Sequence, residues 1–180
     1  MKLGSLLSLA TCVVASSLSL SAEDNPPAPA AAPAPTAAAP TAPAAPKLDF
    51  GDNNSATITG KAWAAHAAKN VAEVKGYVAR VRELYEATAI QQQASLTEPV
   101  PTSDKEKVFS YWALNDVGTS LFILGQTLEQ SGDKPGALAA YKILVDKLAF
   151  AQCWDAKGWF WRPAEAARAR VKALEFDAAE

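Results

Sequence analysis

Histidine, cysteine and methionine are scarce in this chain of 180 residues, and their scarcity excludes most catalytic and metal-binding chemistry. The chain has one histidine, two cysteines and one methionine. His66 has no second histidine or cysteine that could join it in a metal site, whereas zinc sites need several such ligands. No nucleophile with a paired base and no glycine-rich phosphate loop can be assembled from the other residues. The sequence therefore predicts a protein that is not an enzyme and has no metal or cofactor.

The chain also lacks an excess of charge of either sign. Its 17 basic and 19 acidic residues give a formal net charge of −2 at pH 7. Proteins that bind nucleic acid carry a basic face, so we expect no nucleic-acid partner. The weakly acidic balance gives no reason to expect binding to anionic lipid either.

The first 22 residues have the layout of a secretory signal peptide. Lys2 gives a positive start, residues 3–20 are apolar and rich in serine, and small residues precede a cleavage site near Ala22. We therefore expect a periplasmic or secreted protein, with no transmembrane helix in the mature chain. An alternative is a lipoprotein signal with a lipid anchor at Cys12, which Thr11 just before it and the continuing apolar run disfavour.

Residues 23–46 predict a disordered linker. From residue 26 to residue 46 the chain contains only proline, alanine and two threonines, which cannot form a core. Such a segment is a semi-rigid spacer, and at about 3.1 Å per residue it reaches roughly 65 Å. The remaining residues, 47–180, are enough for one domain with its own core.

Only one cysteine, Cys153, remains after the predicted cleavage, so the mature chain cannot form an internal disulfide. An odd cysteine in an exported protein is either a buried thiol or part of an intermolecular bridge. Phe150, Trp154 and Trp159 lie close to it in the sequence, and we therefore expect a buried thiol.

Every long segment after Ser55 has helical periodicity, and none gives a strand signal of useful length. Asn70 with Glu73, and Ser103 with Glu106, have the spacing of capping boxes. Asp133 suits a helix start, and Pro163 suits a first helical turn. The sequence predicts an all-α domain with helices over residues 55–69, 71–94, 103–130, 133–148 and 163–176.

The stretch from residue 121 to residue 144, LFILGQTLEQSGDKPGALAAYKIL, has the most specific pattern. It reads as two amphipathic helices separated by Ser131-Gly132-Asp133, with a small residue where the helices would cross. This pattern resembles a tetratricopeptide (TPR) unit. The residues that carry it are Leu121, Leu124, Gly125 and Leu128 in the first helix, and Ala137, Tyr141 and Leu144 in the second.

The resemblance is good over residues 118–150 and degenerate over residues 55–88. In the degenerate unit Val74, Val78 and Val81 fall where Ala137, Tyr141 and Leu144 fall in the better one, but the Leu-Gly pair is missing. The good unit has Ala149 where the repeat usually has proline. The resemblance implies two antiparallel helical hairpins plus a C-terminal capping helix. Because a free-standing solenoid usually needs at least about three repeats, that last helix must cap the stack, or the protein self-associates.

In TPR proteins the first helix of each unit lines a concave groove that holds a peptide or another chain. Carried onto this sequence, the resemblance places Thr119, Phe122, Gln126 and Glu129 in the groove from the better unit, and Trp63 and His66 from the weaker one. Aromatic and amide groups together suit an extended peptide or a helix. The alternative is that Phe122 belongs to the core and the other residues are ordinary surface.

A second unusual feature is the aromatic segment FAQCWDAKGWFWRP at residues 150–163, which contains Trp154, Trp159 and Trp161. One interpretation is a lid, in which the rings seal the C-terminal helix against the helical stack. The other is an exposed platform that stacks on sugars or anchors a partner chain. We favour the lid, since most aromatic side chains are core.

Together these features predict an exported, non-catalytic TPR-like module that mediates protein–protein interaction, as an adaptor or scaffold in a bacterial envelope. The expected partner is a protein or peptide. One alternative is a protein that binds glycans or the cell wall through the segment from Trp154 to Trp161. Another is an accessory subunit of a larger envelope complex.

Overall fold

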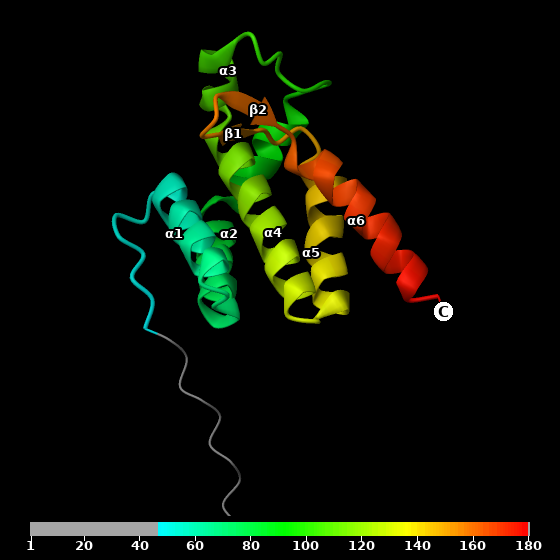
Figure 1. Ribbon diagram of the computed structural model, residues 1–180. Coiled ribbons are helices and arrows are strands. Elements are labelled where there is room, and N and C mark those ends of the chain that lie inside the picture. The colour runs from blue at the N-terminus through cyan, green and yellow to red at the C-terminus, as the bar shows by residue number, and fades with distance from the viewer. Residues whose placement is uncertain (1–46, 180) are drawn as a thin grey trace, which may run out of the picture. The chain divides into compact units, whose positions relative to one another are not determined.

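The computed structural model describes residues 47–179, and the predicted signal peptide (1–22) and Pro/Ala-rich linker (23–46) lie outside this range. The described part is mainly helical, which confirms the predicted all-α fold (Figure 1). Its elements are α1 (Ser55–Ala67), α2 (Val71–Ala94), α3 (Lys105–Ser110), α4 (Trp112–Gln130), α5 (Lys134–Lys147), β1 (Cys153–Asp155), β2 (Trp159–Trp161) and α6 (Pro163–Asp177).

The helices form two hairpins, α1–α2 and α4–α5, each closed by a short turn, and α6 packs along α5. Helix α4 is central, because it contacts α1, α2, α5 and α6. In Figure 1 helices α1, α4 and α6 face the viewer, with α2 behind α1. The β1–β2 hairpin contacts α4 and lies near its N-terminal end, next to α3.

The caps predicted for the two helical hairpins are present. The Asn70 side chain accepts a hydrogen bond from the Glu73 backbone N–H at 3.2 Å, which starts α2. The Asp133 side chain accepts one from the Gly136 N–H at 2.9 Å, which starts α5. Each cap satisfies a backbone donor that the helix itself leaves unpaired. The two turns are therefore encoded locally in the sequence.

The prediction of a single helix over residues 103–130 is wrong, because the helix is interrupted at Tyr111. Tyr111 has φ −88° and ψ 38°, and α3 ends before it while α4 begins after it. Asp104, and not Ser103, caps α3. Helix α4 has no side-chain cap of its own, and the Leu114 N–H instead donates to the Gln92 side chain of α2 at 2.8 Å. The start of α4 is therefore bonded to a distant segment of the chain, and a local sequence pattern does not reveal such a contact.

The all-α domain also contains one short β hairpin, for which the sequence shows no strand signal of useful length. Residues 153–155 pair with residues 159–161 in an antiparallel hairpin, with Trp154 opposite Phe160. Gly158, at φ +105°, takes the turn conformation that other residues rarely adopt. Three-residue strands are too short to show the alternation that identifies a strand in a sequence.

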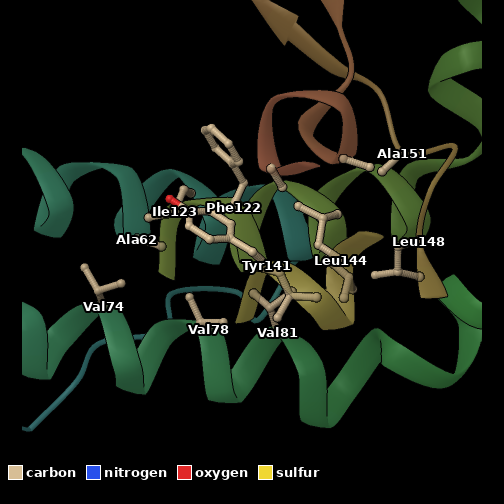
Figure 2. Packing of buried hydrophobic residues seen from close by; sticks show 14 of the residues in the cluster. Ala62, Val74, Val78, Val81, Phe122, Ile123, Tyr141, Leu144, Leu148 and Ala151 are labelled. Carbon is tan, nitrogen blue, oxygen red and sulfur yellow. The ribbon is translucent and has the colours of Figure 1, made fainter. Parts of the chain in front are cut away.

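Tyr141 is the largest fully buried side chain and lies where α4 and α5 cross. A Cβ atom at Gly125 would overlap its ring, so a residue without a side chain is required there. Figure 2 shows the Tyr141 ring within the cluster, and the Phe122 ring lies 6.0 Å from it. The TPR-like stripe of the sequence is therefore a packed interface, with Leu124 half-buried and its other members buried.

The segment before α1 covers the outer face of the first hairpin. The Leu48 side chain fills the space next to Gly76, and Phe50 packs edge-on against Tyr77 with the ring centroids 6.0 Å apart. The Arg80 guanidinium donates twice to the side-chain oxygen of Asn53. This segment therefore packs on α2 around Gly76 and Tyr77.

Candidate binding groove

An aromatic-rimmed groove opens between α1, the start of α4 and β1. We call it the aromatic groove, and its volume is about 380 Å³. Trp63 of α1, Phe109 of α3, Trp112 of α4 and Trp154 of β1 line its sides. Its floor includes Thr59, Asn115, Asp116, Thr119, Gln152 and Cys153.

Three of the four rim aromatics are unusually exposed. Phe109 is 52% exposed, Trp112 44% and Trp154 38%. Neighbouring rings hold them from one side: Trp112 packs edge-on against Tyr85 at 5.3 Å, and Trp154 against Phe160 at 4.8 Å. Exposed apolar groups gathered around a hollow are typical of interaction sites, and these rings are already fixed in position.

The floor of the groove is polar and internally hydrogen-bonded. The Ser55 hydroxyl lies 2.5 Å from the Asp116 carboxylate, to which it donates. The Thr59 and Ser120 hydroxyls are 2.9 Å apart. Burial raises the pKa of the Asp116 carboxyl above its usual value of 3.8, and the Ser55 hydrogen bond opposes this shift only in part. The carboxylate is therefore destabilised by its surroundings when it is charged.

Replacing Asp116 by asparagine should stabilise the protein at neutral pH. A raised pKa in the folded state means that the Asp116 contribution to stability is greatest below the unfolded value of 3.8. That contribution is lost as the pH rises through the folded pKa. The gain in free energy of unfolding for Asp116→Asn, measured by urea unfolding, should therefore shrink as the pH falls from neutral toward 3.8.

Asp146→Asn, at an exposed position, is the control. An equal gain for Asp116→Asn at neutral pH and at pH 3.8 would contradict the prediction.

Two side-chain amides attach the β hairpin to the helices. The Asn115 oxygen accepts the Gln152 backbone N–H at 2.8 Å, while its nitrogen donates to the Val108 carbonyl at 2.8 Å. The Gln152 side chain donates to the Val100 carbonyl at 2.7 Å. Asn115 thus joins the end of α3, the start of α4 and the segment leading into β1, and so helps to position Trp154.

The six residues predicted to form one groove lie in three separate hollows. Trp63 and Thr119 line the aromatic groove, although Thr119 is only 4% exposed. Phe122, Gln126 and Glu129 line a hollow between α4 and α6. His66 lines a third, with Thr127.

Phe122 packs with the core and not freely in a groove. It is 7% exposed, and its ring lies 6.0 Å from that of Tyr141 and 5.0 Å from that of Trp161. Replacing Phe122 would therefore disturb packing as well as any bound partner.

The three tryptophans of the aromatic segment have three different environments. Trp161 is half-buried against Phe122, as a lid would require. Trp154 forms part of the groove rim. Trp159 is 49% exposed, and the Lys157 ammonium lies 5.9 Å from its ring.

Sequence reasoning missed Phe109, Trp112 and Asp116 as groove residues. A signal for two of them was present, because Trp112, Asp116 and Thr119 share one helical face by their spacing. Phe109 carried no such signal, since the break at Tyr111 decides where its ring lies.

His66 and Cys153, which could carry chemistry, are both partly buried. The Thr127 hydroxyl donates to the Ile123 carbonyl, so it accepts from Nδ1–H of His66 at 2.7 Å. Burial lowers the pKa of His66 and raises that of the Cys153 thiol. Cys153 is half-buried, where full burial was expected. Among residues 47–179, no cluster of histidine, cysteine or acidic residues could hold a metal ion.

Comparison of the chain with protein-family models, with curated proteins and with solved structures finds no match. In the described part of the chain, no helix is both long and apolar enough to cross a membrane.

Proposed function

We propose that this protein is a TPR-like interaction module that binds an extended segment of a partner protein in the aromatic groove, as an adaptor or scaffold. The observation that carries the proposal is the set of exposed rings, Phe109, Trp112 and Trp154, around one hollow. Aromatic residues dominate binding energy at protein interfaces, because they bury large area with few rotatable bonds. These rings stand on packed elements, so binding costs little ordering entropy.

The TPR-like character of the module has structural support. Two helical hairpins pack side by side, with Gly125 under Tyr141 at the crossing of the better unit. The segment from Leu48 to Asn53 covers one end, and α6 packs at the other. Two repeats can therefore form a stable stack without a third. Location in a bacterial envelope is part of the proposal and depends on the predicted signal peptide.

The alternative of glycan binding through the aromatic segment has less support. Its three tryptophans do not form one surface, because Trp161 packs on Phe122. Trp159 lines none of the hollows described above and presents a single exposed ring.

Gly60 offers a clean test of the groove. It lies on the groove side of α1, and a Cβ atom added there would meet nothing within 4 Å. Gly60→Ala should therefore stabilise α1 by about 0.5–1 kcal/mol and leave the groove open. Gly60→Phe should place a ring in the groove without disturbing the core.

Peptides selected from a random displayed library against the wild-type chain should bind Gly60→Ala equally well. They should bind Gly60→Phe at least about tenfold more weakly, the loss expected when an interface anchor is blocked. Circular dichroism should show that both variants keep their helix content. If no selected peptide distinguishes Gly60→Phe from Gly60→Ala, the aromatic groove is not the binding site.

A further inference from the structure

Within residues 47–179, Asp116 is the only charged residue that lines the aromatic groove, and it has no counter-ion. The lining contains no lysine or arginine, and none of the ion pairs found in this part of the chain includes Asp116. Its carboxylate accepts a hydrogen bond from the neutral Ser55 hydroxyl. Burial raises the pKa of this carboxyl, and no neighbouring cation opposes that shift. A cation bound in the groove would therefore compensate a half-buried charge.

The walls of the groove suit a cation as well. They are formed by the aromatic rings of Trp63, Phe109, Trp112 and Trp154, and aromatic rings attract ammonium groups through their faces. One cation of the chain already makes such a contact, because the Lys105 ammonium lies 4.9 Å from the centroid of the Trp154 ring. Lys105 is not among the lining residues, so the described lining itself still contains no cation. Aromatic rings around a carboxylate are the kind of cage that recognises ammonium ligands.

A second unpaired group in the floor favours a ligand that brings hydrogen-bond donors. Gln152 lines the groove and is 4% exposed. Its side-chain nitrogen donates to the Val100 carbonyl, but its Oε1 is the one buried side-chain oxygen or nitrogen among residues 47–179 that has no partner. Leaving a buried acceptor without a donor is costly. An ammonium group has three N–H donors and no acceptor, so it matches a floor in which both unpaired groups are acceptors.

We propose that the segment bound in the aromatic groove presents a lysine side chain, whose ammonium lies among the rings and pairs with the Asp116 carboxylate. Lysine is favoured over arginine, because Asp116 Oδ2 already accepts from Ser55 and arginine pairs best with both oxygens of a carboxylate. The apolar stem of lysine can pack between the rings while its charge reaches the floor. This inference rests on the proposed function and names the chemistry of its ligand.

The experiment uses the library peptides that bind the wild-type chain and lose affinity for Gly60→Phe. Each peptide has a blocked N-terminus and is made in two forms, one with free lysine and one with every lysine acetylated, which removes the charge. Both forms are titrated with the wild-type chain and with Asp116→Asn, and binding is read by fluorescence anisotropy. Asparagine has nearly the shape of aspartate and can still accept from Ser55, so the groove should keep its form.

The selected peptides should contain lysine, and acetylation should weaken their binding to the wild-type chain at least about tenfold, the loss expected when one partner of a desolvated charge pair is removed. Asp116→Asn should weaken binding of the free-lysine form by a similar factor. In Asp116→Asn, acetylation should cost at most about threefold, because both changes remove the same ion pair and only the attraction to the rings remains. Asp146→Asn, which changes an exposed carboxylate outside the groove, is the matched control and should leave the affinity unchanged.

Lys105 tests the sign of the bound charge. Lys105→Gln removes a positive charge beside the groove, so the free-lysine form should bind this variant as tightly as the wild-type chain or more tightly. Weaker binding would show that the groove attracts acidic groups, and the inference would then be wrong.

Peptides that are sensitive to Gly60→Phe but lack lysine, or that keep their affinity after acetylation, would overturn the inference and leave the proposed function standing. The same conclusion follows if acetylation costs as much in Asp116→Asn as in the wild-type chain, because the charge would then be recognised elsewhere. If the library yields no peptide sensitive to Gly60→Phe, both the inference and the proposed function fail.

Discussion

Replacing Tyr141 by alanine should lower the free energy of unfolding by about 3–5 kcal/mol, the usual cost of truncating a large buried aromatic side chain. The Tyr141 side chain is fully buried and fills the place left by Gly125 at the crossing of α4 and α5. The cavity cannot be closed easily, because α4 is also fixed by α1 and α2. Urea unfolding followed by circular dichroism gives the difference directly.

Substitution of Gly125 tests the same contact from the α4 side. Gly125→Ala alone should cost about 1–3 kcal/mol, because the new methyl group overlaps the Tyr141 ring. In the Tyr141→Ala background the same methyl group has room, so the two losses should not add. Trp159→Ala is the control for removing a large aromatic that is exposed. If Tyr141→Ala costs no more than this control, or if the two core losses add fully, the packing described here is wrong.

The helical hairpins could be predicted because their signals are local. Asn70 and Asp133 cap their helices within three residues, and Gly125 with Tyr141 marks the crossing by spacing alone. The hydrophobic stripes also follow the helical period. In these segments, local preference and final packing agree, which is the expected condition of a sequence that folds well.

The aromatic groove could not be predicted in the same way, because three separate segments build it. Trp63, Trp112 and Trp154 come together only after α4 has begun at Trp112 and the β hairpin has formed. Gln92 of α2 is hydrogen-bonded to the start of α4, and Asn115 is hydrogen-bonded to the segment that leads into the hairpin. Neither contact leaves a periodic trace in the sequence. The TPR resemblance also placed Phe122 in a groove that runs along α4 from Thr119 to Glu129, whereas Phe122 is packed in the core.

Asn115→Ala should cost about 1–3 kcal/mol, because it removes an amide that bridges two backbone groups and leaves one of them, the Gln152 N–H, without its partner. The Val108 carbonyl also loses a hydrogen bond but still accepts the Tyr111 N–H. Gln126→Ala is the matched control. It removes another half-buried amide from the same helix, one with no hydrogen bond found among residues 47–179, so its effect should stay within about 0.5 kcal/mol.

Hydrogen exchange locates the effect of Asn115→Ala in the structure. The Gln152 amide and the backbone of residues 153–161 should exchange faster in this variant, while α5 should keep its protection, because local opening follows the loss of local contacts. Unchanged exchange in the hairpin, or a loss of unfolding free energy equal to that of Gln126→Ala, would show that Asn115 does not hold the hairpin.

If Asn115 holds the hairpin, the wall of the groove that carries Trp154 becomes mobile in the Asn115→Ala variant. Ligands of the aromatic groove should then bind more weakly under conditions where the helical signal is intact, which separates the formation of the groove from the stability of the helices beneath it.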